Sequence, residues 1–297
     1  MSGFNGIIRG NGYMDQAGTL RKIKTTSHTA GTVNQHLKGV AVASGKGGVG
    51  KTNVVANMAF KLASQGNRVL VFDADMGLGN IHILLGMAPQ FNVGHVLTGT
   101  KKLKDILVKG PGGIMILPAS TGNKKYSELA AEEKLVLKTE LEVLQDDFDY
   151  ILFDIGAGIS ANVMFFCSAV QDVVLVASPE PTSFSDAYVV MKVLSRDHRV
   201  NRFKLIINSC RNRKEAINVF QRLVMVSDKF GLGIKMDFLG HVLFDDSVPR
   251  AVYKQRLFCD AYPAAEASKN IGNIVDTLVK TVSRGELAWG DVFGASV

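Results

Sequence analysis

The segment 44–52, SGKGGVGKT, restricts the folds open to this chain more than any other part of the sequence. It follows an apolar run at 39–43 and precedes a segment, 51–65, in which apolar side chains recur at helical spacing. This order of strand, glycine-rich turn and helix matches the G-x-x-x-x-G-K-T phosphate-binding loop. Its glycines allow positive φ angles, so backbone N–H groups can face phosphate oxygens in front of a helix N-terminus. The sequence therefore predicts a phosphate-binding α/β domain.

The motif assigns roles to its last two residues. Lys51 should contact the β- and γ-phosphates, and the Thr52 hydroxyl should face Mg²⁺. A dinucleotide-binding domain is the main alternative, since Asp73 ends the next strand, where such a domain places a ribose-binding acid. That fold, however, requires G-x-G-x-x-G, in which the Gly-Lys-Thr triplet has no place. We therefore expect a nucleoside triphosphate with Mg²⁺.

Seven apolar runs alternate with helical patterns along the chain. Nearly all are apolar throughout, as is typical of strands buried on both faces of a parallel sheet. The runs are 39–43, 68–73, 113–118, 149–154, 172–177, 202–208 and 237–242. Helical spacing occurs at 51–65, 128–145, 183–195 and 213–230, and Ser127 should cap the helix that starts at Glu128. The predicted fold class is α/β, with a doubly wound, mainly parallel sheet of about seven strands.

Three acidic residues follow two of these runs. Asp73 and Asp154 each close a strand, and Asp75 comes two residues after Asp73. Because the carboxyl ends of parallel strands meet at one edge of the sheet, the three carboxylates should converge on the phosphate loop. Asp154 is expected to hold Mg²⁺ through water, as a Walker-B aspartate does. The alternative is that these acids are solvated loop residues.

Residues 1–38 differ from the rest in composition. They are rich in Gly, Thr, Ser and Asn, show no sustained periodicity, and contain one helix-compatible patch at 15–23. We expect a flexible N-terminal arm (1–38), a folded domain (39–284) and a C-terminal tail (285–297). The chain has no apolar run near ~18 residues and no signal-peptide core at its start, which predicts a cytoplasmic protein. Its net charge of +7 favours anionic partners without identifying one.

The C-terminal helical pattern, 264–284, has one apolar stripe. It is made of Ile271, Ile274, Val275, Leu278, Val279 and Val282. Such a stripe belongs to a core helix more often than to a membrane anchor, so we expect it to cover the sheet. The tail beyond it contains Trp289 and Phe293 but also Glu286 and Asp291, and lacks the basic face that anionic lipid favours. Peripheral membrane contact is therefore a secondary expectation.

The second lysine of the loop, Lys46, makes the segment resemble the deviant Walker A motif of the MinD/ParA class of ATPases, over about residues 39–260. The resemblance implies an ATPase that forms an ATP-bound homodimer, in which Lys46 reaches the partner's phosphates and supports hydrolysis together with Lys51. It also implies that Asp75 orients the attacking water, since this carboxyl is too acidic for an efficient base. Asp73, Asp154 and Thr52 would lie on the magnesium side. The expected nucleotide-binding residues are Gly45, Lys46, Gly47, Gly48, Val49, Gly50, Lys51, Thr52 and Asn208, the last at the adenine.

Within that class the sequence is similar to the bacterial FlhG-type regulators of flagellar number and placement, also called FleN or YlxH. The arm contains DQAGTLR, like the element by which these proteins stimulate a signal-recognition-type flagellar GTPase. The resemblance implies partner contacts through Asp15, Gln16, Ala17, Leu20 and Arg21. The stretches FDADMGLGNIHILLG, FNVGHVLTG, GIMILPAS and SPEPTSFSDAY also look like this subfamily. Flagellar switch (C-ring) proteins and a transcription activator are further partners that it suggests.

Two other functions remain open. The same ATPase could select a division site or partition chromosomes, or it could act as a nucleotide-gated brake on a flagellar transcription activator, with hydrolysis incidental. Short basic clusters, such as Lys101, Lys102 and Lys104, are more often solvated faces than DNA contacts. We therefore expect no specific nucleic acid partner.

Overall fold

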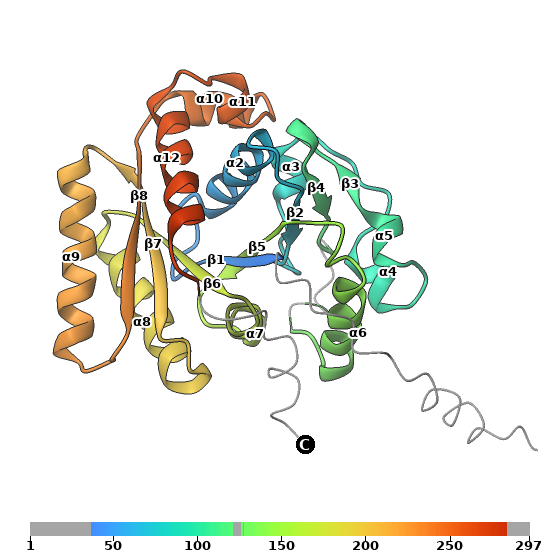
Figure 1. Cartoon of the computed structure of the whole chain (residues 1–297), viewed down its shortest axis with the longest axis horizontal. Coiled ribbons are helices and arrows are strands. Elements are labelled where there is room, and N and C mark those ends of the chain that lie inside the picture. The colour runs from blue at the N-terminus through green and yellow to red at the C-terminus, as the bar shows by residue number, and fades with distance from the viewer. Residues whose placement is uncertain (1–36, 121–125, 127, 284–297) are drawn as a thin grey trace, which may run out of the picture. The chain divides into compact units, whose positions relative to one another are not determined.

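The computed structural model describes residues 37–120, 126 and 128–283, and Figure 1 shows a sheet with helices on both of its faces. Within these residues, eight strands form one sheet in the order β3-β4-β2-β5-β1-β6-β7-β8. The strands are β1 Lys38–Ser44, β2 Val69–Asp73, β3 Val108–Lys109, β4 Met115–Leu117, β5 Tyr150–Ala157, β6 Asp172–Ala177, β7 Arg202–Cys210 and β8 Lys235–Leu243. The doubly wound, mainly parallel sheet is confirmed.

The strand that the sequence did not predict is β3. It has two residues, pairs antiparallel with β4 at the edge of the sheet, and is too short to show any alternation of side chains. The seven predicted strands are all present, and all of them pair in parallel. The carboxyl ends of β1, β2 and β5 therefore lie at one edge of the sheet, where the phosphate loop begins.

The longer helices agree with the predicted segments in place but not always in their ends. They are α2 Lys51–Ser64, α6 Ala131–Glu142, α7 Ala161–Ala169, α8 Pro181–His198, α9 Arg213–Lys229 and α12 Glu266–Lys280. The predicted start of α6 at Glu128 is wrong, because its N-cap is Ala130, whose N–H donates to the Glu133 carboxylate at 3.0 Å. Helix α7 was missed because nearly all of its side chains are buried, which removes the periodic pattern.

Five short α-helices and one 3₁₀ helix, Pro111–Gly113, complete the described part of the chain; the five are α3 Ile81–Leu84, α4 Val93–Leu97, α5 Leu103–Ile106, α10 Ser247–Tyr253 and α11 Phe258–Ala261. Ser127, the expected cap, lies outside the described residues. So do the patch at 15–23 and nearly all of the proposed arm and tail, whose boundaries remain predictions.

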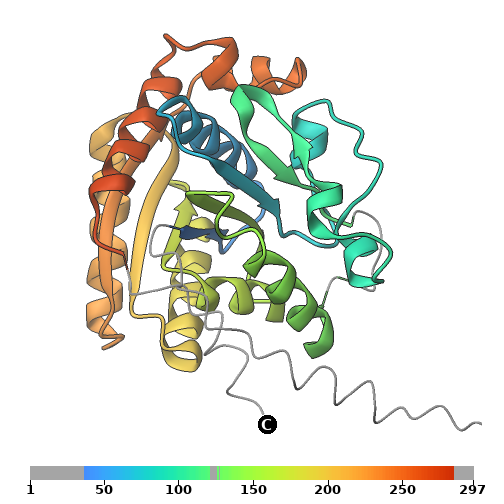
Figure 2. The ribbon, with the colours of Figure 1, turned by 45° about the vertical axis from the view of Figure 1, so that its right-hand side comes forward.

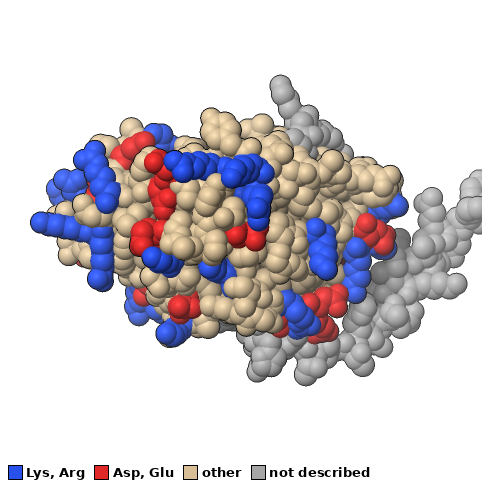
Figure 3. All heavy atoms as spheres, turned by 90° about the horizontal axis from the view of Figure 1, so that it is seen from above, with Lys and Arg blue, Asp and Glu red and all other residues tan. Residues whose placement is uncertain are grey.

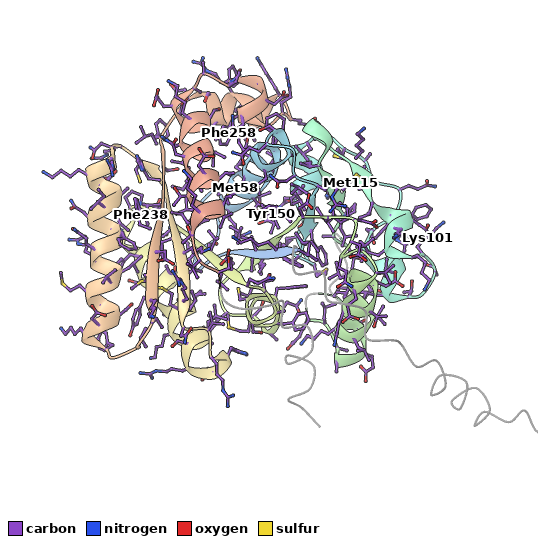
Figure 4. All side chains as sticks on the ribbon, in the orientation of Figure 1. Met58, Lys101, Met115, Tyr150, Phe238 and Phe258 are labelled. Atoms are coloured by element: carbon purple, nitrogen blue, oxygen red, sulfur yellow. The ribbon has the colours of Figure 1, made fainter. Side chains whose placement is uncertain are left out.

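Alternate side chains of each central strand pack into two cores, one on each face of the sheet. Val40 and Val42 face the core under α2 and α12, whereas Ala41 and Ala43 face the core under α7 and α8. Figure 2 shows α2 and α12 together on one face. Met58 of α2 and Phe258 of α11 are both buried in this core (Figure 4). Burial on both faces explains why the strands read as unbroken apolar runs.

Helix α12 is a core helix, as the stripe predicted. Four of its six stripe residues are fully buried against β8 and α2, namely Ile271, Ile274, Val275 and Leu278. Val279 and Val282 are exposed, which corrects the stripe at its C-terminal end. None of the helices described between residues 37 and 283 combines the length and apolar character that a bilayer crossing requires. The face seen in Figure 3 mixes basic and acidic side chains with broad uncharged areas, so the net charge is not gathered there.

At the sheet edge opposite the phosphate loop, the buried carboxylate of Asp172 collects three groups. Lys204 Nζ lies at 2.8 Å and Lys38 Nζ at 3.2 Å, and the Ser283 hydroxyl donates a hydrogen bond of 2.9 Å. The side chains of Asp172 and Lys204 are each only 2% exposed. Lys38 also donates to the carbonyl of Leu278 in α12. One carboxylate thus joins β1, β7 and the segment after α12.

Candidate functional site

The phosphate loop runs from the end of β1 to the start of α2. Gly48 and Gly50 have φ angles of 81° and 85°, a region that favours glycine. Gly50 is the N-cap of α2, so no side chain caps the helix, and its first turn contains no acidic residue. The N–H groups of the first turn can therefore donate to a bound ligand, and the helix dipole favours an anion at this point.

Two glycines of the loop are required by close neighbours. A Cβ on Gly45 would overlap the backbone of Asp186 in α8, and one on Gly50 would overlap the side-chain amide of Asn208. In contrast, a Cβ on Gly47 or Gly48 would have nothing within 4 Å in the protein. The open space beside these two glycines lies where the motif places the phosphates.

Lys51 and two of the three predicted acids come together below this loop. Lys51 Nζ is 2.7 Å from Asp154 Oδ1, and both side chains are largely buried. Asp73 and Asp154 are register partners on the neighbouring strands β2 and β5, so their carboxylates lie close to each other. Asp75 lies beside the backbone of Gly156, where a Cβ would be 3.5 Å from its Oδ1. The sheet therefore gathers the acids at the edge that the sequence predicted.

Asp73 is an unsatisfied carboxyl in this site. Its Oδ2 accepts the N–H of Ile81 at 3.2 Å, but its Oδ1 is buried with no hydrogen-bond partner. Burial, reinforced by the nearby Asp154 carboxylate, raises the pKa of Asp73 to about 8. A divalent cation is a ligand that would satisfy both the orphaned oxygen and the paired carboxylates.

The acids fit Mg²⁺, with Thr52 as the third group near the phosphates. Among the described residues no cluster of three His, Cys, Asp or Glu side chains forms a closed metal site. Mg²⁺ binds through few protein carboxylates and takes its remaining oxygens from water and phosphate. Asp73, Asp154 and Thr52 are thus the residues that would hold it.

A pH dependence follows from the raised pKa of Asp73. Between about pH 4 and pH 8 the folded protein without metal should hold one proton that the unfolded chain has released, so the contribution of Asp73 to the free energy of unfolding falls as pH rises. Mg²⁺ must displace that proton. We expect Mg²⁺ affinity of the ATP-bound protein to rise about fivefold from pH 7 to pH 8, and about twofold more above pH 8 before it levels off. Calorimetric Mg²⁺ titrations would measure it, and an Asp73→Asn variant should lose the dependence; equal affinity at both pH values in the wild type would contradict it.

The pKa of Asp75 is also raised, mainly by burial, with Lys51 acting in the opposite direction. The carboxyl is therefore less acidic than the sequence argument assumed. Its assignment as the residue that orients water stays a prediction, which its place beside Lys51 and Asp154 supports.

Lys46 does not reach into its own phosphate loop. Its Nζ lies 2.5 Å from the Glu180 carboxylate and 3.1 Å from the Thr182 hydroxyl, at the start of α8, and the side chain is 39% exposed. Neither Glu180 nor Thr182 was expected at the site from the sequence, although the stretch SPEPTSFSDAY contains both. Of the loop's two lysines, one is therefore paired inside the site and the other at its surface.

A cavity of about 580 Å³ extends from the loop to the C-terminal part of the domain. It is lined on one side by Gly48, Val49, Gly50 and Asn208, and on the other by Phe244, Val248, Pro249, Val252 and Tyr253. The Asn208 side-chain NH₂ donates to the Val49 carbonyl at 2.7 Å, which fixes the orientation of the amide. Its oxygen can then accept a hydrogen bond from a ligand, such as the amino group of adenine. The far wall, α10, was missed because seven residues show no helical period.

The residues predicted to bind a partner, Asp15, Gln16, Ala17, Leu20 and Arg21, lie outside the described residues.

Comparison with known proteins places the chain among nucleotide-binding proteins. A family model described as an AAA domain matches residues 37–202. The antiactivator FleN of Pseudomonas aeruginosa is 41% identical over 229 residues, which cover 77% of this chain and 81% of that protein. The flagellum site-determining protein YlxH of Helicobacter pylori is 32% identical over 252 residues, which cover 85% of each.

Two solved structures that contain MinD proteins match this chain. The MinC:MinD cell division complex of Aquifex aeolicus matches with a TM-score of 0.67 and 26% identity, over 82% of this chain and 96% of that chain. MinD of Pyrococcus horikoshii, complexed with Mg-ADP, matches with a TM-score of 0.66 over 82% and 96% of the two chains. At 21% identity the second likeness concerns the fold alone.

Proposed function

Because this chain belongs to the MinD/ParA-type ATPases, among the flagellar number and placement regulators that include FleN and YlxH, we propose that it is an ATP-dependent dimerising switch. ATP would close two copies face to face over two nucleotides, and hydrolysis would separate them. The domain binds ATP; the dimer, the hydrolysis it controls and the partners belong to the proposal.

The observation that carries the proposal is the position of Lys46. Lys51 is paired with Asp154 inside the site, whereas the Lys46 ammonium is paired with Glu180 at the protein surface. Placed against the phosphates of a second copy, the same cation would stabilise charge that develops as the γ-phosphate is transferred. Hydrolysis would then depend on dimerisation.

The rim of the site supports a face-to-face contact. Exposed apolar side chains surround the carboxyl edge of the sheet: Leu78 follows Asp75, Ile159 follows β5, and Phe244 and Tyr253 border the cavity. Tyr253 is 90% exposed. Large apolar side chains exposed on one face of a protein favour a contact there, since burial between two copies would remove them from water.

Each residue would then have one task in hydrolysis. Lys51 would leave Asp154 for the β- and γ-phosphates, and Thr52, Asp73 and Asp154 would hold Mg²⁺. When bound, Mg²⁺ neutralises phosphate charge. Asp75 would orient the attacking water in line with the γ-phosphate, and Lys46 of the partner would complete the site. Without that lysine, turnover would be slow.

The finer part of the proposal concerns the N-terminal arm, which we propose acts on a signal-recognition-type flagellar GTPase through DQAGTLR. Removing residues 1–36 should reduce stimulation of that GTPase to its basal rate, because the domain loses its contact element. ATP binding should stay unchanged, since β1 begins at Lys38 and the site lies wholly within 37–283. Single-turnover GTP hydrolysis, with full-length and truncated protein at equal concentration, measures the effect. Full stimulation by the truncated protein would exclude the arm as the contact.

A nucleotide-gated brake on a transcription activator is a second candidate. It is favoured by FleN, which is named an antiactivator. Under this function the ATP-bound dimer would bind the activator and the arm would be dispensable for that contact. The truncation therefore separates the two functions.

A further inference from the structure

Helix α10, which forms the far wall of the cavity, ends in an unusual residue. The N–H of Gln255 bonds to the carbonyl of Val252, and the N–H of Arg256 to that of Ala251. This is a Schellman cap, in which the residue at the Gln255 position takes a left-handed conformation and is usually glycine. Gln255 has a φ of 52°, one of three positive values among non-glycine residues in the described chain. A left-handed backbone is unfavourable for a residue with a Cβ, because the Cβ approaches the following carbonyl oxygen.

The side chain of Gln255 offers what glycine cannot. Its Nε2 donates to the carbonyl of Ile83 in α3 at 3.0 Å. Helix α3 ends in the same kind of cap, because the N–H of Gly86 bonds to Ile83 and Gly86 has a φ of 62°. A Cβ on Gly86 would lie 3.2 Å from Gln255 Oε1, so glycine keeps the approach open. The two helix ends therefore meet at one carbonyl.

The other end of α3 touches the magnesium side of the site. Its first residue, Ile81, donates its N–H to Asp73 Oδ2. Helix α3 has only four residues, and Ile81 and Leu84 are buried in the core that also contains Phe258. A shift of so short a packed helix at Ile83 is transmitted to Ile81.

We propose that Gln255 is a positioning residue that couples the cavity between the phosphate loop and α10, where the nucleotide base would bind, to Asp73. A base bound against Val252 and Pro249 of α10 would fix the end of that helix, Gln255 would hold α3, and α3 would hold Asp73 in place for the metal. The inference rests on the proposed ATP-binding function and adds a connection between the two ends of the nucleotide. Its energetic scale is that of one hydrogen bond, which corresponds to a threefold to tenfold effect, on the order of 1 kcal/mol.

Three variants of the full chain test this connection. Gln255→Glu keeps the size and the left-handed backbone but loses the donor. Gln255→Gly removes both the side chain and the backbone strain. Arg199→Gly is the matched control, because exposed Arg199 also ends a helix, α8, in the left-handed region, with a φ of 56°. Thermal unfolding of the free proteins should show both glycine variants at or above the wild-type midpoint.

Hydrogen exchange and the Mg²⁺ dependence of ATP binding test the role of Gln255 without a measurement of hydrolysis. Hydrogen exchange of residues 81–86 should slow when ATP is added with EDTA to the wild type and to Arg199→Gly, but not in either Gln255 variant. The Mg²⁺ concentration that half-maximally tightens ATP binding should rise about threefold to tenfold in both Gln255 variants only. Unchanged Mg²⁺ midpoints would overturn the inference, and so would a Gln255→Gly protein that melts well below the wild type, since Gln255 would then be only a structural cap. If the wild type binds no ATP, the proposed function fails first; if it binds ATP while residues 81–86 stay unprotected, this inference alone fails.

Discussion

Replacing Lys46 by alanine should lower ATP turnover about 10³-fold and abolish the ATP-dependent dimer, while ATP binding to the monomer stays nearly unchanged. The reason is the separation of the two lysines. Lys51 lies inside the site, 2.7 Å from Asp154, whereas Lys46 is paired with Glu180 at the surface. If Lys46 does not act in its own site, its removal can lower turnover only because it acts in the site of a second copy.

The measurement is the oligomer mass by light scattering, with ADP and with a non-hydrolysable ATP analogue, alongside steady-state turnover. Asp75→Ala is the matched comparison. It should bind ATP and accumulate as a dimer, because Lys46 remains, yet turn over slowly, because the water is no longer oriented. A wild-type protein that stays monomeric with the analogue, or a Lys46→Ala protein that dimerises and hydrolyses normally, would remove the basis of the switch.

The sequence predicted the parts of the site that depend on local patterns. The loop at 44–52 has a fixed spacing and a fixed context of strand and helix. Asp73 and Asp154 could be placed because they end apolar runs, and the ends of parallel strands share one edge of the sheet. The seven parallel strands of the sheet could be predicted from the apolar runs and from the helical periods between most of them.

The parts that the sequence did not predict depend on contacts between distant segments. Glu180 meets Lys46 across more than a hundred residues of chain, and no spacing rule connects them. The wall formed by α10 is one short helix whose residues face a cavity on one side and the core on the other. No sequence pattern predicts the role of Gln255, because it is distinguished only by its positive φ angle. The start of α6 was misplaced because the sequence pattern pointed to a hydroxyl cap, whereas at the observed start the Glu133 carboxylate accepts from the N–H of Ala130.

The pairing of Lys46 with Glu180 is a weak surface contact that leaves the lysine free to change partners. The pair is partly exposed, so it contributes little to stability and is easily exchanged for a stronger partner. A triphosphate on a second copy would be such a partner, since phosphate offers more charge than a single carboxylate. The cost of leaving Glu180 is then small compared with the gain at the phosphates, which suits a protein that must open and close repeatedly.

The largest expected effect on stability lies at the other edge of the sheet. Asp172→Asn should lower the free energy of unfolding by about 3–5 kcal/mol, because it removes the buried carboxylate that Lys204 and Lys38 share. Lys204 is 2% exposed, so its charge has no access to water. The variant should also loosen the segment after α12, where Ser283 donates to the same carboxylate. Urea unfolding and exchange of residues 278–283 measure the two effects.

Lys204→Met gives the opposite test of the same cluster. Desolvation lowers the pKa of Lys204, which shows that burial disfavours its charged form, although Asp172 opposes the shift. Methionine fills a similar volume without a charge, and Asp172 keeps Lys38 and Ser283 as partners. We therefore expect Lys204→Met to change the free energy of unfolding by less than about 1 kcal/mol, or to raise it. Equal losses in Asp172→Asn and Lys204→Met would contradict this asymmetry, and would mean that the pair stabilises the fold as a unit and not through the carboxylate.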